Sequence, residues 1–236
     1  MLVWSRSTYR MMVVASGLVA ACGHDNRAPT PPKNSSVAPP IALGTVLLIG
    51  TSLTAGYGLD PADAWPAHVQ EKADSASLRF RIVNAGVSGE TSADALHRID
   101  WLLSQGVPSV VLVETGANDA LRGQPVDSIR ANIDGILARF DALAPRPVIV
   151  VAGMEALPNL GREYGQRFRG IFAPAAQRHH AVYLPFLLSG VAGVDSLNQR
   201  DGIHPNATGS RRVADNVWRT LGPILDSLQR GAHGNL

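Results

Sequence analysis

The chain has a single cysteine, Cys22, among its 236 residues. Without a second cysteine, the fold cannot rely on an internal disulfide. The sequence also lacks a His-Glu-x-x-His run, a cysteine cluster and a glycine-rich phosphate loop followed by lysine. Metal and nucleotide chemistry therefore have no basis in its motifs, and we expect neither a metal nor another cofactor.

The sequence also has no strong excess of one charge. Its 21 Lys and Arg residues nearly balance its 19 Asp and Glu residues, which gives a net charge of +2 and a pI near 9.0. The arginines are scattered rather than gathered in a basic stripe, so we expect no nucleic-acid partner. No internal repeat is evident. Nothing in the sequence specifies the oligomeric state, for which a monomer is the default expectation.

Long hydrophobic runs are missing too. The uncharged N-terminal stretch from Met11 to Ala21 is too short to span a bilayer as an ordinary helix, and no stop-transfer pattern follows it. Arg6 and Arg10 precede the stretch and small residues end it, which is the pattern of an export signal. We therefore expect the protein to be exported, with residues 1–22 as its signal peptide.

Cys22 closes that signal. The residues Val19-Ala20-Ala21-Cys22 resemble the lipobox of bacterial lipoproteins, in which the cysteine becomes the acylated first residue of the mature protein. This resemblance predicts that the membrane is a partner through a lipid anchor. Because Gly23 rather than Asp follows, we expect the bacterial outer membrane. The alternative is ordinary cleavage nearby with an idle thiol, which would leave the protein periplasmic or secreted.

The rest of the chain divides by composition. Residues 23–40 are rich in Pro, Asn, Ser and Ala without apolar periodicity, which predicts a disordered tether. Residues 41–230 are expected to form one domain, and residues 231–236 a disordered tail. A domain of about 190 residues can bury a substantial core without metals or disulfides.

Short apolar runs indicate the fold class. Continuous, β-branched runs suit strands that are buried on both faces of a sheet. Three strong runs and two weaker ones predict strands at 46–49, 110–113, 148–151, 81–84 and 181–184. Helical spacing between them predicts helices at 62–74, 92–104, 126–143, 162–179 and 207–228. This alternation predicts an α/β fold with a parallel sheet and helices on both of its faces.

Polar, glycine-rich turns follow three of the predicted strands. Ser52 follows the first strand, Gly86 to Gly89 the second, and Gly116 to Asp119 the third. In such sheets, sites form beyond the carboxyl ends of the strands. We therefore expect the three turns to converge on one edge.

Ser52 is the candidate nucleophile. Gly50, Gly56 and Gly58 let the backbone turn sharply around it, which exposes the hydroxyl and leaves backbone N–H groups free to face an oxyanion. A serine after a strand more commonly caps the following helix, so Ser52 needs a base nearby to be active.

His204 is the candidate base. Of the seven histidines, it alone lies in a polar loop with a carboxylate three residues before it, Asp201. That carboxylate can accept a bond from the imidazole Nδ1–H and fix its tautomer, or it can simply cap its own turn. Asn118, just past a buried strand, can donate to a developing negative charge, although Asn is also a common turn residue.

Four ordered blocks give the chain a family resemblance. They are Gly50-Thr51-Ser52-Leu53, Gly86-Val87-Ser88-Gly89-Glu90-Thr91, Gly116-Ala117-Asn118-Asp119 and Asp201-Gly202-Ile203-His204-Pro205-Asn206. These blocks resemble those of the SGNH (GDSL-type) esterase and lipase family across nearly the whole domain. Residues 54–60 and 121–123 narrow the resemblance to the branch of bacterial arylesterases and acyl-thioesterase/lysophospholipases.

The resemblance implies a fold and a set of roles. The fold is a three-layer α/β/α sandwich whose five-stranded parallel sheet has the flavodoxin-like order 2-1-3-4-5. Ser52 would be the nucleophile, His204 the general base and then acid, and Asp201 its orienting partner. The oxyanion donors would be the backbone N–H groups of Ser52 and Gly89 and the side-chain amide of Asn118.

One residue departs from the family pattern. The family usually has Asp before the nucleophile, whereas this chain has Thr51. Asp201 can still orient His204, so we expect retained activity with an altered pH profile. The charge and hydrogen bonding beside Ser52 are left open.

The expected reaction is hydrolysis of acyl or aryl carboxylic esters through an acyl-enzyme, with thioesters and lysophospholipids as further small-molecule or lipid substrates. Leu121, Met154, Leu157 and Leu160 are candidates to line an apolar trough, or equally to pack the loops against the sheet. One alternative is a carbohydrate O-acetylesterase with the same triad. Another, motivated by Thr51, is a surface lipoprotein that keeps the scaffold as a non-catalytic binding module.

Overall fold

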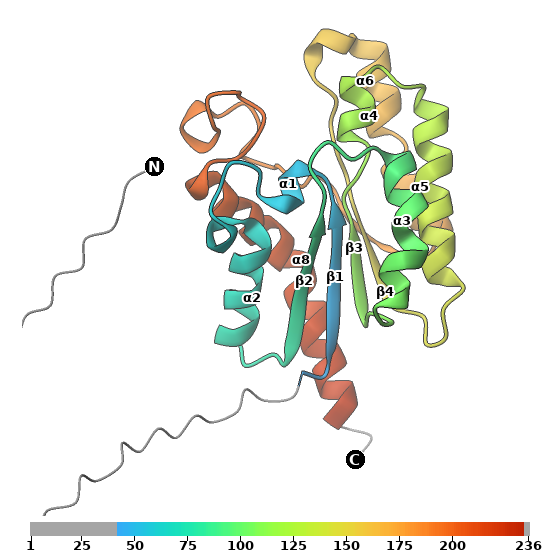
Figure 1. The fold of residues 1–236 in the computed structure, drawn as a ribbon, viewed down its shortest axis with the longest axis vertical. Coiled ribbons are helices and arrows are strands. Elements are labelled where there is room, and N and C mark those ends of the chain that lie inside the picture. The colour runs from blue at the N-terminus through green and yellow to red at the C-terminus, as the bar shows by residue number, and fades with distance from the viewer. Residues whose placement is uncertain (1–41, 234–236) are drawn as a thin grey trace, which may run out of the picture. The chain divides into compact units, whose positions relative to one another are not determined.

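The computed structural model describes residues 42–233 of the chain (Figure 1). The predicted signal peptide, Cys22 and the predicted tether lie outside the described residues. Within residues 42–233, none of the helices combines the length and the apolar character needed to cross a membrane.

Five strands form one parallel sheet in the order β2-β1-β3-β4-β5, which confirms the predicted order. In chain order the strands are β1 (Gly44–Gly50), β2 (Phe80–Gly86), β3 (Val110–Val113), β4 (Val148–Ala152) and β5 (Val182–Leu184). All of β3 is buried, and so are the last five residues of β1. The continuous apolar runs form the central strands because both faces of the sheet are covered.

Helices cover both faces of the sheet (Figure 1). On one face, α2 (Trp65–Ser75) packs against α8 (Ala207–His233). On the other face, α5 (Val126–Asp141) lies between α3 (Ser92–Ser104) and α7 (Phe172–Arg178) and contacts both. The predicted three-layer α/β/α sandwich is therefore confirmed.

One helix that was predicted to be continuous is broken in the structure. Residues 162–179 form two helices, α6 (Arg162–Arg169) and α7, separated at Gly170. Glycine has a poor helix propensity, and here its N–H closes the last turn of α6 on the carbonyl of Gln166. Five short elements were not predicted: α1 (Ser52–Ala55), α4 (Ala117–Leu121) and the 3₁₀ helices Pro61–Asp63, Pro158–Leu160 and Asp195–Leu197.

The final helix is longer than predicted. It continues to His233, through the first residues of the expected disordered tail. Its last turns are held by Gln229, whose Oε1 accepts the N–H of Arg79 at 2.8 Å and whose Nε2 donates to the carbonyl of Ser77 at 3.1 Å. These bonds join α8 to the segment that enters β2, which explains why the helix persists.

The carboxyl ends of the strands carry the functional turns (Figure 1). α1 follows β1 and α4 follows β3, and the long loop after β5 returns to the same edge. Gly86, at the end of β2, lets α1 approach closely, since a Cβ there would lie 2.2 Å from the backbone nitrogen of Ala55. A side chain at Gly86 would therefore displace α1, which carries Ser52.

Candidate active site

The turn after β1 presents the predicted nucleophile. Thr51 is the extended N-cap of α1, and its hydroxyl accepts a weak bond from the N–H of Leu53 at 3.4 Å. Ser52 is the first residue of α1, so its own N–H has no partner within the helix. Gly56 ends the helix in the left-handed conformation, with φ of +79°. The chain therefore turns sharply after β1, as predicted, and the bend contains the single helical turn α1.

Ser52, His204 and Asp201 form a continuous hydrogen-bonded chain. The Ser52 Oγ lies 2.8 Å from Nε2 of His204, and Nδ1 of His204 lies 2.7 Å from Oδ2 of Asp201. The three residues come from two segments that are 152 positions apart at the serine–histidine contact. The arrangement has the contacts that proton transfer from a serine hydroxyl requires.

Asp201 both orients the imidazole and caps its own turn. While Oδ2 faces the ring, Oδ1 accepts the backbone N–H groups of Ile203 at 2.9 Å and His204 at 3.0 Å. These bonds lower the pKa of Asp201 from 3.8 to about 2, with the His204 backbone bond as the largest cause, followed by the imidazole bond and the Ile203 N–H. The two roles weighed for this residue are thus compatible, because each uses a different oxygen.

Tyr57 covers the imidazole from the side. Its ring centroid lies 4.8 Å from that of His204, with the rings tilted by 43°. Gln199 links the two loops, since its Nε2 donates to the Tyr57 carbonyl at 2.7 Å and its N–H donates to the His204 carbonyl at 2.7 Å. The contact of Tyr57 with His204 could not be predicted from the sequence, because only the tertiary fold brings the two rings together.

The predicted oxyanion donors line the same pocket. Ser52, Gly89, Asn118 and His204 all face a cavity of about 220 Å³. Gly89 has φ of +82°, which favours glycine, and the space where its Cβ would lie is open. One amide hydrogen of Asn118 is used by the Glu90 carbonyl at 2.9 Å, which leaves the other for a ligand.

Charged side chains hold the loops that carry these donors. Arg98 donates to the buried carboxylate of Glu90, with Nη2 at 2.8 Å from Oε2, and to the carbonyl of Ala85 at 2.6 Å. Burial raises the pKa of Glu90, and the Arg98 bonds oppose that rise. Arg122 donates to the Gly89 carbonyl at 3.0 Å. The backbone of the Gly89 loop is therefore fixed from two sides.

Asp119, next to Asn118, anchors α4 to α3. Its two oxygens accept the N–H of Ser92 at 2.8 Å and the Ser92 hydroxyl at 2.6 Å. Asp119 is buried, and it faces the start of α3 rather than the cavity. Its contribution is to place Asn118, which sequence reasoning did not foresee.

Glu114 is a further residue that sequence reasoning missed. It follows β3 directly, is fully buried, and accepts bonds from the Thr51 N–H at 2.8 Å and from the Thr54 hydroxyl at 2.9 Å. Burial raises its pKa, against the lowering effect of these bonds. A glutamate directly after a fully apolar run is the signal that could have identified it.

An apolar hollow of about 340 Å³ adjoins the pocket. The predicted lining residues Leu121, Met154 and Leu157 border it, and Leu121 also borders the pocket that holds Ser52. The prediction fails for Leu160, which ends the 3₁₀ helix Pro158–Leu160 and packs against the hydrophobic core instead.

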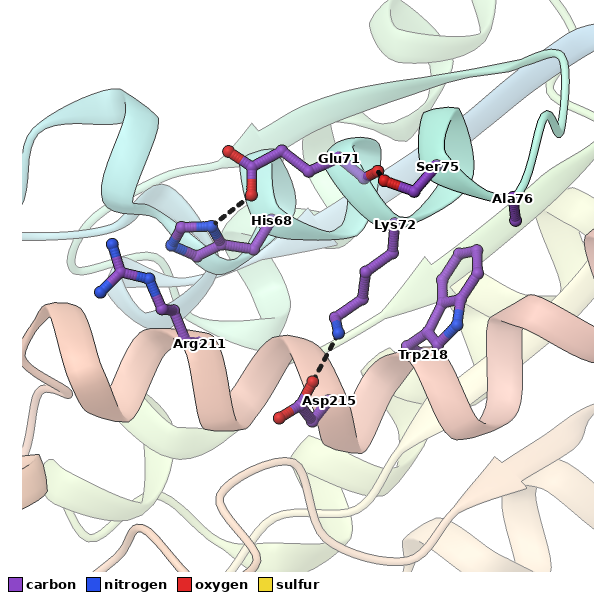
Figure 2. Close-up of a pocket in the computed structure, with 8 residues that line it drawn as sticks. All are labelled: His68, Glu71, Lys72, Ser75, Ala76, Arg211, Asp215 and Trp218. Carbon is purple, nitrogen blue, oxygen red and sulfur yellow. Dashed lines mark hydrogen bonds and ion pairs between the residues drawn. The ribbon is translucent and has the colours of Figure 1, made fainter.

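A larger hollow, about 690 Å³, lies elsewhere, between α2 and α8 (Figure 2). Its charged groups have partners: Lys72 pairs with Asp215 at 2.6 Å, and Arg211 pairs with Asp63 at 3.3 Å. None of the triad residues borders it. Size alone therefore does not select the candidate site, where Ser52, His204 and the predicted oxyanion donors line one pocket. Among residues 42–233, no group of three His, Cys, Asp or Glu side chains is arranged to hold a metal ion.

Comparison with known proteins shows the family of the chain. The model of the GDSL-like lipase/acylhydrolase family matches residues 48–212. The esterase TesA of Pseudomonas aeruginosa is 35% identical over 184 residues, covering 78% of this chain and 90% of that protein. The thioesterase 1/protease 1/lysophospholipase L1 of Escherichia coli K12 is also 35% identical, over 185 residues that cover 78% of this chain and 86% of that protein.

Solved structures share the fold. A crystal structure of TesA has a TM-score of 0.72 at 35% identity and covers 76% of this chain and 99% of its own. The psychrotrophic esterase EstA from Pseudoalteromonas, in a structure inhibited by monoethylphosphonate, has a TM-score of 0.73 at 32% identity and covers 77% and 98%. With these matches, the chain belongs to the GDSL-like lipase/acylhydrolase family, the SGNH hydrolases, and is a serine hydrolase of carboxylic esters.

Proposed function

We propose that this esterase acts through Ser52, His204 and Asp201. The observation that carries the proposal is the unbroken contact from the Ser52 Oγ to His204 at 2.8 Å and from His204 to Asp201 at 2.7 Å, at the edge of a pocket. The Ser52 oxygen attacks the carbonyl carbon of the ester while its proton moves to Nε2 of His204. Asp201 stabilises the imidazolium that results.

The negative charge develops on the former carbonyl oxygen. We assign its stabilisation to the N–H groups of Ser52 and Gly89 and to the free amide hydrogen of Asn118. When the tetrahedral intermediate collapses, the alcohol or thiol leaves with the proton from His204. Water then gives a proton to His204 and attacks the acyl-enzyme, and collapse of the second intermediate returns that proton to Ser52 and releases the carboxylic acid.

The substrates proposed are esters with an apolar acyl or aryl group, including thioesters and lysophospholipids. The hollow beside Leu121, Met154 and Leu157 supports this choice, because an acyl chain leaving the Ser52 pocket would pass along Leu121 into apolar surroundings. The relatives carry names of the same kind: esterase, thioesterase and lysophospholipase. A carbohydrate O-acetylesterase would not need this hollow.

The test is hydrolysis of p-nitrophenyl esters of graded acyl length by the wild type, Ser52→Ala and His204→Ala. We expect each variant to lose at least about 10³-fold in kcat. Activity on acetyl esters only would favour the carbohydrate alternative, and the absence of any ester hydrolysis by the wild type would favour the binding module. If both variants match the wild type, the proposed triad is wrong.

We also propose that the protein is exported and lipidated at Cys22. The support is the sequence alone: Arg6 and Arg10 before the uncharged stretch, and the lipobox-like residues 19–22. Cys22→Ser should move the protein from the membrane fraction to the soluble fraction of cells that express the full chain. Unchanged membrane association of that variant would contradict the lipid anchor.

A further inference from the structure

We propose that Thr51 and Glu114 are positioning residues, a buried hydroxyl–carboxylate pair that fixes the nucleophile turn and so keeps Ser52 within reach of His204. The proposal rests on the proposed function, since it takes Ser52 as the nucleophile. It accounts for the one residue in which this chain departs from the family pattern.

The side-chain hydrogen bonds of Glu114 go to the turn that carries Ser52. Its Oε2 accepts the Thr51 N–H at 2.8 Å and the Thr54 hydroxyl at 2.9 Å. The Thr51 hydroxyl lies 3.0 Å from Oε1 and 3.1 Å from Oε2. Thr51 is 1% exposed and Glu114 is 0% exposed, so water cannot replace these bonds. One carboxylate therefore holds the residues on both sides of Ser52.

The hydroxyl of Thr51 has two tasks. It donates its proton to Glu114, and its oxygen accepts the Leu53 N–H at 3.4 Å. An ionised Asp at this position could accept that N–H but could not donate to Glu114, and it would place a second negative charge beside a buried carboxylate. Glu114 thus favours a neutral hydroxyl at position 51. Thr51, in place of the family's usual Asp, therefore suits Glu114 as its partner.

The turn has no spare room in which to shift. A Cβ at Gly50 would lie 2.1 Å from the Thr54 Oγ1 and 2.6 Å from the Glu114 Oε2. The end of β1, the carboxylate and α1 are therefore packed in direct contact. Loss of a bond in this group should move the Ser52 Oγ relative to His204, and a misplacement of about 1 Å can cost on the order of 10²-fold in rate.

The first experiment removes and restores the hydroxyl. Thr51→Val keeps the shape and loses the donor, whereas Thr51→Ser keeps the donor. We expect Thr51→Val to lower kcat and the rate of Ser52 phosphonylation by a monoalkyl phosphonate ester about 10- to 10²-fold, with KM little changed, and Thr51→Ser to restore most of both. If Thr51→Val does not fold, Glu114→Gln, which keeps the size but loses one acceptor, should show the same kcat loss.

The second experiment tests the charge. In Thr51→Asp, two carboxylates must share a proton, so kcat relative to that of the wild type at the same pH should fall as pH rises between about pH 5 and 9. The further charged group acting on Glu114 is Glu90, which is itself paired with Arg98. The double variant Thr51→Asp/Glu114→Gln, which removes the repulsion, should lose this pH-dependent fall.

The outcomes separate the two proposals. If Thr51→Val and Glu114→Gln keep the wild-type kcat and pH profile while Ser52→Ala is inactive, the positioning role is wrong and the proposed function stands. Full activity of Ser52→Ala would overturn the proposed function and this inference together. A fall in thermal stability without a change in kcat would make the pair purely structural, which also contradicts the proposal.

Discussion

Asp201 and Glu114 each use a carboxylate to organise a turn of the site, but one lies near the surface and the other in the core. The Asp201 side chain is 38% exposed, whereas Glu114 is 0% exposed. Hydrogen bonds from the His204 backbone and imidazole lower the pKa of Asp201 to about 2, while burial raises the pKa of Glu114. The two carboxyl pKa values shift in opposite directions because hydrogen bonding is the largest cause for Asp201 and desolvation is the largest cause for Glu114.

The difference matches the task that we propose for each carboxylate. Asp201 must stay charged to stabilise an imidazolium, and its partly exposed position makes that charge easy to keep. Glu114 must hold a backbone turn, which requires acceptors in a fixed place rather than a free charge. Asp201 thus keeps its charge beside His204, where the proposed chemistry needs it, whereas buried Glu114 keeps the turn in a fixed position.

The largest effect should come from removing the charge of Asp201. In Asp201→Asn, the amide oxygen would accept the two backbone N–H bonds and the amide NH₂ would face Nδ1 of His204, which favours the wrong tautomer, so we expect kcat to fall about 10³- to 10⁴-fold. The measurement is steady-state hydrolysis of an aryl ester. Asp195→Asn, in the same long loop but outside the triad, is the matched control and should keep wild-type kcat. A loss of less than ten-fold in Asp201→Asn would remove Asp201 from the triad.

Asn118→Ala should have the next largest effect, because it removes a proposed oxyanion donor. It leaves both Asp201 and Glu114 in place. We expect kcat to fall about 10²- to 10³-fold, with intact pH dependence. Asn118 also donates to the Glu90 carbonyl, so the fold of the variant must be checked by circular dichroism. A normal kcat in a correctly folded variant would show that the oxyanion is held without this amide.

Tyr57 contacts the same histidine as Asp201, but it does so through its ring rather than through a hydrogen bond to Nδ1. Its ring, 4.8 Å away, can stabilise the imidazolium by a cation–π interaction worth about 0.5–1 kcal/mol at an exposed site. Tyr57→Leu should therefore lower kcat about two- to five-fold, and Tyr57→Phe, which keeps the ring, should not. Equal activity of both variants would exclude the ring contact as a contributor.

The smallest effect concerns stability against pH. Because the pKa of Asp201 is lowered on folding, its contribution to the free energy of unfolding is present above 3.8 and is lost as pH falls towards about 2. For Glu114, whose pKa is raised, the contribution is present in acid and is lost as pH rises through the raised value. Urea unfolding of the wild type and Asp201→Asn should therefore converge only as pH falls to about 2.

Glu114→Gln provides the opposite half of that stability test. Relative to the wild type, it should be least stable in acid, with the difference narrowing as pH rises. Parallel curves for this variant and the wild type would mean that Glu114 does not change its pKa on folding.

Much of the fold followed from patterns along the chain. The β-branched runs that predicted strands at 46–49, 110–113 and 148–151 lie within β1, β3 and β4. The single helix predicted at 162–179 was wrong, because a break at one glycine does not disturb a helical pattern averaged over a longer segment. The short helices α1 and α4 were missed, since four or five residues are too few to show a period.

The site divides in the same way. Ser52, Asp201, His204 and Asn118 could be selected by residue type and local position, and Gly89 by the family resemblance. Tyr57 and Asp119 could not, because their partners lie elsewhere in the sequence. Glu114 has one local signal, its place directly after an apolar run, but its partners Thr51 and Thr54 are 63 and 60 positions away. Leu160 was wrongly chosen for the trough, since an apolar residue in a loop can face either the core or a cavity.

The sequence by itself determined the alternation of strands and helices and the residue types available for acyl transfer, because apolar periodicity and side-chain chemistry are local properties. Only the tertiary structure decided which groups meet. The parallel sheet brings Glu114 from the end of β3 beneath Thr51 at the end of β1, and the return of the last loop brings His204 to Ser52. Those contacts arise from the packing of distant segments, so neither the orientation of Ser52 nor the partner of its neighbour Thr51 can be predicted from the motif alone.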